Sequence, residues 1–259
     1  MLVPHGCVVD PDWHKSPEAE RYLGAALRRN QRGPWGLLER PVLSPQEAAD
    51  VVSYKVFVSG RSAVGKTALV ASLGGLQVPS AHHETTGIQT TSVYWPAKLR
   101  ESGRPLFFKF TFWDCGGSVV KKFDHILPAC IEKVDGFLLL FSFTDRASFD
   151  DLPSQISRVA EGAKNAVRIV IGTKFDQFAH TDVTEHDVAA FHRSWGLPVL
   201  RAKSINAPGS HAGLSNVAHL LNGLAEHLWR QDQQAAGLLP PSASPKDSAA
   251  GAGGTAHHA

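Results

Sequence analysis

Short apolar runs alternate with amphipathic runs along most of the chain, and this alternation constrains the fold more than any other feature. We predict strands at YKVFVSG, GFLLLFSF, AVRIVIGT and LPVLRA, and helices at KTALVASL, SFDDLPSQISRVAEGA, TEHDVAAFHRSW and LSNVAHLLNGLAEHLW. Two further strands, TTSVYWPAKL and PLFFKFTFWD, are joined by the turn-rich RESGR and predict one antiparallel edge. We therefore predict an α/β fold with a doubly wound, mostly parallel six-stranded sheet, helices on both faces and ligands at the carboxyl ends of the strands.

The alternation divides the chain into an N-terminal extension (1–53), a domain (54–230) and a C-terminal tail (231–259). In the extension, SPEAERYLGAALRRN predicts a helix from Pro17 to Arg29 with Ser16 as its cap. The RGPWGLLERPVLSP that follows contains more Trp and Leu than a flexible linker needs, so residues 17–43 are expected to dock either on the domain or on a partner. The tail is rich in Pro, Ser, Ala and Gly and is expected to be disordered.

The composition argues against several classes of protein. The 26 basic and 24 acidic residues give a net charge of +2, too small for us to expect nucleic acid as a main partner. The three cysteines show no metal-ligand spacing and no apolar signal segment stands at the start, so reduced thiols and a cytoplasmic protein are expected. The chain has no glycine at position 2 and no cysteine near its end, which predicts no direct lipid anchor.

One short motif follows the first predicted strand of the domain and opens its first predicted helix. GRSAVGKT fits the pattern GxxxxGK[ST], in which glycines let successive N–H groups converge on phosphate oxygens and the helix start adds a favourable dipole. Lys66 is expected to neutralise the β- and γ-phosphates, and the Thr67 hydroxyl to hold Mg²⁺. The motif predicts a P-loop NTPase that binds a nucleoside triphosphate through Gly60, Arg61, Ser62, Ala63, Val64, Gly65, Lys66, Thr67 and Ala68.

Polar residues at the ends of later strands indicate which nucleotide binds. Asp114, in FTFWDCGG, is placed to hold Mg²⁺ through water, and the Gly117 N–H to reach a γ-phosphate. Asp176, in TKFD, can accept hydrogen bonds from the N1 and N2 donors of guanine, a pair that adenine lacks, so we predict GTP and GDP as ligands. After the next strand, Ala202 supplies an N–H group where guanine O6 would lie.

Together these motifs resemble those of the Ras superfamily of small GTPases, over roughly Ser53 to Trp229. The resemblance makes Thr85, in ETTGI, the switch I threonine that binds Mg²⁺ and the γ-phosphate, and WDCGG the switch II segment. It also adds to the nucleotide-binding residues Thr173, Lys174 and Lys203. The segments TTGI and FTDRASFDDL look Rab-like.

More closely, the extended N-terminus, GRSAVGKTALVASL, TFWDCGG and GTKFD resemble the REM- and Rab-like small GTPases that act as effectors of ciliogenesis and planar polarity. This resemblance implies GTP binding and association with the planar polarity proteins Fuzzy and Inturned. It also implies a role at the basal body and cytoskeleton, in cilium assembly, intraflagellar transport and vesicle trafficking or exocytosis.

Several residues depart from the family pattern. Ser118 stands where a glutamine orients the attacking water, and serine is too short for that task, so weak intrinsic hydrolysis is expected and no other catalytic residue is assigned. Thr173 replaces an asparagine and Val78 stands where an aromatic residue covers guanine, which predicts weaker affinity and faster exchange. Arg201 replaces the serine of the SAK motif, and Ser62 leaves room for an arginine finger from a partner.

Other polar residues have simpler interpretations. Cys115 has no basic neighbour in hydrogen-bonding spacing and is expected to be an inert thiol. His82 and His83 form no metal-ligand pattern and are expected in a solvated loop. Thr184 with Asp187 predicts a capping box at a helix start.

Three functions stay open on the sequence alone. The favoured one is a GTP–Mg²⁺ switch in a multiprotein assembly, in which the γ-phosphate orders Thr85 and Gly117 into a partner surface. A structural pseudoGTPase scaffold with little nucleotide dependence and an ordinary cycling GTPase are the alternatives. A P-loop kinase is least favoured, because the sequence shows neither an arginine-rich lid nor an acceptor site.

Overall fold

A computed structural model describes residues 7–28, 49–76, 78, 85, 87–116, 127–203 and 211–240. Its centre is one six-stranded sheet with the strand order β2-β3-β1-β4-β5-β6. The strands are β1 (Asp50–Gly60), β2 (Ile88–Lys98), β3 (Pro105–Cys115), β4 (Gly136–Ser142), β5 (Val167–Thr173) and β6 (Val199–Arg201). All neighbouring strands are parallel except β2 and β3, which form the antiparallel edge. The predicted α/β fold is confirmed.

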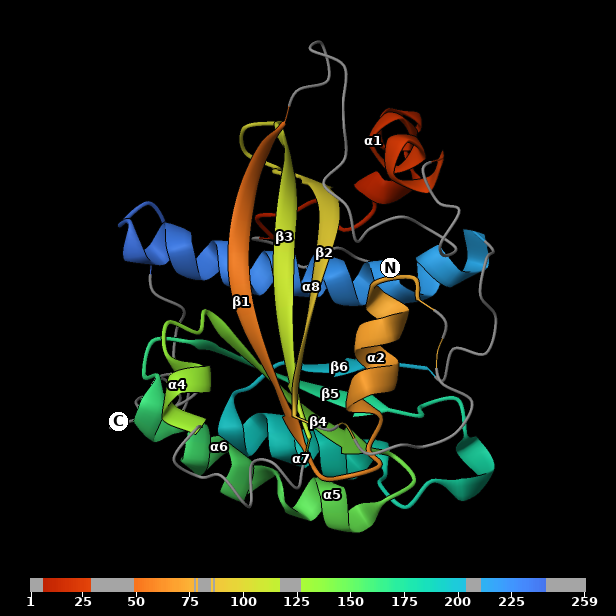
Figure 1. Cartoon of the computed structure of the whole chain (residues 1–259), viewed down its shortest axis with the longest axis vertical. Coiled ribbons are helices and arrows are strands. Elements are labelled where there is room, and N and C mark those ends of the chain that lie inside the picture. The colour runs from red at the N-terminus through yellow and green to blue at the C-terminus, as the bar shows by residue number, and fades with distance from the viewer. Residues whose placement is uncertain are drawn as a thin grey trace, which may run out of the picture.

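Helices cover both faces of the sheet (Figure 1). They are η1 (Trp13–Lys15), α1 (Pro17–Arg28), α2 (Lys66–Leu73), α4 (Leu127–Ile131), α5 (Arg146–Asp150), α6 (Leu152–Gly162), η3 (Phe178–His180), α7 (Glu185–Trp195) and α8 (His211–Ala235). One core cluster joins the sheet to α1, α2 and α8, and a second joins it to α4, α5, α6 and α7. Figure 1 shows α8 crossing behind β1, β3 and β2 at a steep angle. No helix in the described ranges combines the length and the apolar content needed to cross a bilayer.

The central strand β4 is buried on both faces. Leu138 and Leu140 point into the cluster that contains α8, whereas Phe137, Leu139 and Phe141 point into the other. Successive side chains of a strand face opposite sides, so a strand covered on both sides must be apolar throughout. This requirement explains the uninterrupted apolar run GFLLLFS.

The folded region extends beyond the predicted domain at both ends. β1 begins at Asp50, and α8 continues to Ala235, so residues 231–235 are the last turn of a helix and not the start of a disordered tail. A contact with the sheet explains this correction, since Asp232 Oδ2 accepts a hydrogen bond of 2.6 Å from the Tyr54 hydroxyl. Residues 241–259 lie outside the described residues.

Much of the N-terminal extension packs on the sheet. α1 occupies the place predicted for a helix at 17–29, and Tyr22 lies 5.5 Å from Trp13 and 6.1 Å from Phe107, between ring centroids. Val9 forms an antiparallel bridge with Leu99 just after β2. For residues 17–28 the structure therefore shows docking on the domain; residues 29–48 lie outside the described residues.

Side chains of α8 hold the extension in place. Glu226 Oε2 accepts the N–H groups of Val8 and Val9, each at 2.8 Å. Asn222 lies between the extension and the core: its Nδ2 donates to the Pro11 carbonyl at 2.8 Å, and its Oδ1 accepts from Trp95 Nε1 at 2.7 Å. Trp95 is fully buried, so this indole N–H depends on Asn222 for its acceptor.

Two local predictions are confirmed. Thr184 and Asp187 form the capping box of α7, and the Thr184 hydroxyl and N–H, which donate to the Asp187 carboxylate, lower the pKa of that carboxyl to about 2. The amphipathic run LSNVAHLLNGLAEHLW, predicted as a helix, lies within α8, and its apolar face is buried at Leu214, Val217, Ala218, Leu221, Leu224, Ala225 and Leu228.

We expect Asn222→Ala to lower the free energy of unfolding by about 1–3 kcal/mol, because it leaves the buried Trp95 indole N–H without an acceptor and removes the hydrogen bond to the Pro11 carbonyl. Urea unfolding followed by tryptophan fluorescence measures the change. Gln234→Ala on the exposed part of the same helix is the matched control, with an expected change below about 0.5 kcal/mol. Equal effects of the two substitutions would show that Asn222 does not anchor the extension.

Candidate functional site

The phosphate loop connects the end of β1 to the start of α2. A Cβ atom at Gly60 would lie 2.8 Å from the Leu140 carbonyl oxygen, so only glycine lets β1 leave the sheet this close to β4. Gly65 caps α2 with a left-handed φ of 98°. Ala63 also has a positive φ, 65°, which costs a non-glycine residue about 1–2 kcal/mol. The loop therefore has the tight, strained shape of an anion-binding turn.

The amino group of Lys66 lies within this loop. The side chain is buried, and Nζ donates to the carbonyl oxygens of Gly60 and Arg61, each at 3.0 Å. These carbonyls hold the ammonium group at the first turn of α2, where the helix dipole also favours an anion. The position matches the predicted role of Lys66 in neutralising phosphate.

Three oxygen-bearing side chains meet beside the loop. The Thr67 hydroxyl donates to Asp114 Oδ2 at 2.5 Å and lies 2.8 Å from the hydroxyl oxygen of Thr85. Thr85 Oγ1 is also 3.5 Å from Asp114 Oδ2. Thr67 comes from α2, Asp114 from the end of β3, and Thr85 from the segment before β2, so three separate parts of the chain converge here.

The oxygen cluster fits Mg²⁺. Asp114 is 2% exposed, and its Oδ1 is buried without a hydrogen-bond partner, which is costly unless a bound water or cation meets it. Hydroxyl and carboxylate oxygens are the ligands that Mg²⁺ prefers, and the ion keeps several waters. Among the described residues no three or more His, Cys, Asp or Glu side chains are placed so that together they could hold a metal ion, so Mg²⁺ here would rely on Thr67, Thr85 and water held by Asp114.

The TKFD segment after β5 supports the phosphate loop. The buried Thr173 hydroxyl donates to the Val64 carbonyl at 2.6 Å, with the Phe141 carbonyl also within 3.0 Å. Lys174 Nζ donates to the Ala63 carbonyl at 3.2 Å. Thr173, at the position where the family pattern has asparagine, thus hydrogen-bonds to the phosphate loop.

The TKFD and RAK segments, which are predicted to recognise the base, are joined through their main chains. The Phe175 N–H donates to the Ala202 carbonyl at 3.1 Å, which places Asp176 next to the RAK segment. The Ala202 N–H donates to the Gly172 carbonyl at 2.8 Å and so already takes part in the pairing of β5 with β6. The predicted hydrogen bond from the Ala202 N–H to guanine O6 would have to share this hydrogen with the Gly172 carbonyl, and it stays a prediction. The next N–H group along the chain is that of Lys203.

The structure does not describe every predicted site residue. Gly117 and Ser118, and with them the switch II glutamine position, lie outside the described residues. Val78 is described and half-buried. Two residues that motif analysis did not assign contact the RAK segment: Glu185 and Phe175 both touch the Arg201 guanidinium. No motif spacing would have identified Glu185, because it approaches Arg201 only in the folded chain.

Cys115, inside the WDCGG motif, has the properties of an unreactive thiol. It is buried, and burial, with smaller effects from Cys130 and Asp114, raises its pKa to about 12. A thiol that stays protonated at neutral pH is a poor nucleophile.

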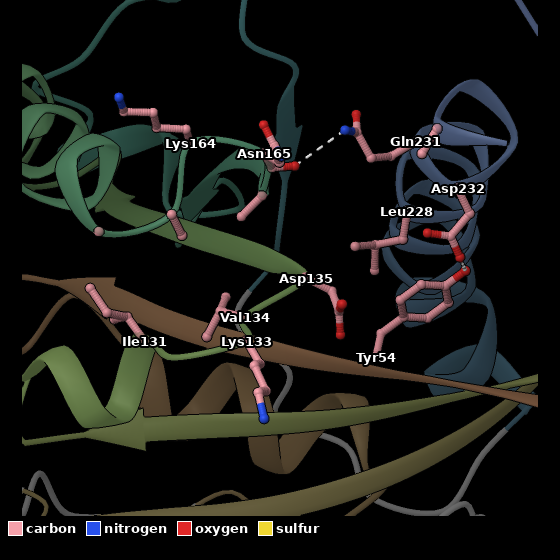
Figure 2. A pocket seen from close by; sticks show the side chains of 14 residues that line it. Tyr54, Ile131, Lys133, Val134, Asp135, Lys164, Asn165, Leu228, Gln231 and Asp232 are labelled. Carbon is pink, nitrogen blue, oxygen red and sulfur yellow. Dashed lines mark hydrogen bonds between the residues drawn. The ribbon is translucent and has the colours of Figure 1, made fainter. Parts of the chain in front are cut away.

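A separate pocket of about 400 Å³ lies far from these motifs (Figure 2). It adjoins the first residues of β4 and β5, the amino ends of the strands, and is lined in part by Tyr54, Asp135, Leu228 and Asp232. Figure 2 shows Tyr54 and Asp232 meeting on one side of it. Burial raises the pKa of both Tyr54 and Asp135. This pocket is at the opposite end of the parallel strands and takes no part in the phosphate site.

Comparison with known proteins identifies similar chains. A model of the Ras family matches residues 55–212. The chain is 60% identical over 253 residues to "Ciliogenesis and planar polarity effector 2" of Homo sapiens, covering 93% of this chain and 97% of that protein. The protein of the same name from Danio rerio is 54% identical, covering 91% and 92%. "GTP-binding protein REM 2" of Homo sapiens is 31% identical over 125 residues, 48% of this chain and 35% of that protein.

We expect Thr173→Val to lower the free energy of unfolding by about 1–3 kcal/mol, because the Val64 carbonyl loses its donor while the side-chain shape is kept. Urea unfolding of nucleotide-free protein measures this loss. Thr181→Val, at an exposed hydroxyl in the next loop, is the control and should change little. A Thr173→Val protein as stable as the control would rule out the support that we ascribe to this hydroxyl.

Proposed function

The chain belongs to the Ras family, and from this premise we propose that it binds GTP with Mg²⁺ and works as a switch or subunit in a ciliogenesis and planar polarity effector assembly. The observation that carries the proposal is the meeting of Thr67, Thr85 and Asp114 beside the phosphate loop. Thr67 and Thr85 would hold Mg²⁺, with Asp114 holding a water molecule of the ion, and the ion would supply positive charge that offsets the charge of the phosphates. Lys66 and the loop amides bind phosphate, and Asp176 selects guanine.

The switch depends on the segment that carries Thr85. The Thr85 hydroxyl reaches Thr67 and Asp114 beside the phosphate loop, and three residues later the chain enters edge strand β2 at Ile88. A γ-phosphate that holds Thr85 therefore orders the start of an exposed edge strand, whereas its loss frees that segment. Such a change at the surface is what a partner can recognise.

The proposed cellular role rests on similarity. Relatives named "Ciliogenesis and planar polarity effector 2" match almost the whole chain at 54–60% identity. We propose that this chain also acts in cilium assembly at the basal body, with Fuzzy and Inturned as partners, and supports intraflagellar transport and vesicle trafficking or exocytosis. Slow hydrolysis, due to Ser118, would let the GTP state persist until a partner ends it.

A structural scaffold is the second candidate, and one observation favours it. Lys66 is held by two loop carbonyls and Thr67 by Asp114, so the protein's own groups partner much of the site. A scaffold would keep one arrangement whichever nucleotide is present. An ordinary cycling GTPase, by contrast, needs some other group to take the place of the missing glutamine.

One experiment separates these functions. Mass spectrometry of freshly purified protein identifies the bound nucleotide, and a pull-down with Fuzzy and Inturned then compares GTP-loaded, GDP-loaded and nucleotide-free protein. The switch requires binding of guanine nucleotide and preferential capture of the GTP-loaded form by the partners. Equal capture of all three forms would favour the scaffold, and protein that binds no GTP even when GTP and Mg²⁺ are added in excess would refute GTP binding.

Asp176→Asn should shift preference from GTP to XTP by on the order of 100-fold or more, because the amide donates where the carboxylate accepts. Competition against a fluorescent guanine nucleotide measures it. Lys66→Asn is the comparison and should bind neither nucleotide. Wild-type protein that binds ATP as well as GTP would show that Asp176 has no part in base recognition.

Ser118→Gln should raise the single-turnover rate of GTP hydrolysis by on the order of tenfold, since glutamine can reach both the attacking water and the phosphate. Ser118→Ala is the control for loss of serine and should leave the slow rate unchanged. If wild-type protein already hydrolyses GTP as fast as the glutamine variant, the slow-switch proposal fails.

A further inference from the structure

Arg201 occupies the position of the SAK serine and makes contacts that serine cannot make. Its Nε donates to Glu185 Oε1 at 3.0 Å, and its Nη2 donates to Glu185 Oε2. Its guanidinium carbon lies 5.6 Å from the centre of the Phe175 ring. One side chain therefore connects the RAK segment, the first residue of α7 and the TKFD segment.

The partners of Arg201 are themselves held in place. Glu185 is the first residue of α7, where the capping box fixes the chain and the helix dipole favours a carboxylate. Arg201 lowers the pKa of the Glu185 carboxyl, so the pair stays charged at neutral pH. The Phe175 ring packs on Phe143 at 5.1 Å, and His219 of α8 contacts the Arg201 carbonyl at 2.7 Å.

The two contacts bracket the groups expected to read guanine. Phe175 directly precedes Asp176, and Arg201 directly precedes Ala202. A guanidinium that pairs in a forked geometry with a fixed carboxylate and stacks on a ring restricts both neighbours at once. Displacing the Arg201 guanidinium would let the Asp176 carboxylate move relative to the main chain of the RAK segment. The two hydrogen bonds that this carboxylate would accept from guanine would then be misplaced.

We propose that Arg201, clamped between Glu185 and Phe175, is a positioning residue that sets the geometry of guanine recognition in place of the SAK serine. The inference rests on the proposed binding of guanine nucleotide and adds a determinant of its selectivity. Arg201 does not touch the base in this role; it acts through Asp176. A merely structural residue would weaken the binding of every nucleotide alike, whereas a positioning residue acts on the guanine-specific contacts.

The test compares the release of fluorescently labelled GDP and IDP from the full chain with Mg²⁺ present. IDP lacks the exocyclic amino group but keeps the N1–H donor, so it reports binding with one of the two hydrogen bonds that Asp176 would accept from guanine. We expect Arg201→Ala to speed GDP release by about three- to tenfold and IDP release by less than about twofold. Glu185→Gln should change the GDP and IDP release rates in the same directions as Arg201→Ala does. Arg201→Lys keeps the positive charge but not the forked pairing with the carboxylate, so it should retain part of the selectivity for GDP.

The matched control is Arg104→Ala, which removes an exposed arginine–aspartate pair, with Asp50, in another part of the structure. It should change neither release rate. Acceleration of GDP and IDP release by the same factor in Arg201→Ala, or no acceleration, overturns the positioning role. Wild-type protein that retains neither nucleotide would instead overturn the proposed function, and the inference with it.

Discussion

The parallel register of β1 between β3 and β4 is the constraint on which the site depends. It pairs Val58 with Asp114 and Gly60 with Leu140, so the phosphate loop leaves the sheet beside the Asp114 carboxylate. The next pairing, β4 with β5, sets Ser142 opposite Thr173. Because every one of these strands points the same way, residues more than a hundred positions apart meet at one edge. A slip of one residue in any pair would turn these side chains to the other face.

The motifs at this edge also support one another mechanically. Thr173 and Lys174 donate hydrogen bonds to the carbonyls of Val64 and Ala63. The TKFD segment therefore stabilises a phosphate loop in which Ala63 has the backbone conformation of a left-handed helix. Tertiary hydrogen bonds of this kind offset local backbone strain. Threonine, shorter than the asparagine of the family pattern, still reaches the Val64 carbonyl and so supports the loop.

Periodicity and motifs predicted the sheet, the phosphate loop and the core face of α8, because each depends on residues close together in sequence. The same patterns could not show that Glu226 binds the amides of Val8 and Val9, nor that Glu185 pairs with Arg201. Such contacts join distant segments and leave no periodic trace. The predicted domain boundary at residue 230 was wrong for the same reason, because the hydrogen bond from the Tyr54 hydroxyl to Asp232 cannot be inferred from the sequence around Asp232.

The N-terminal extension shares a hydrophobic core with the sheet and with α8, so these parts form one folded unit. The stretch shared with the Ras family, 55–212, excludes Trp13 and Tyr22 at one end and Leu224 and Leu228 at the other, all of them in a single core. A fragment limited to residues 55–212 would expose Trp95 and the buried residues around it to water. The residues that cover Trp95 and its neighbours therefore lie partly outside the stretch matched by the Ras-family model, so the first 28 residues belong to the folded unit and are not a dispensable addition to it.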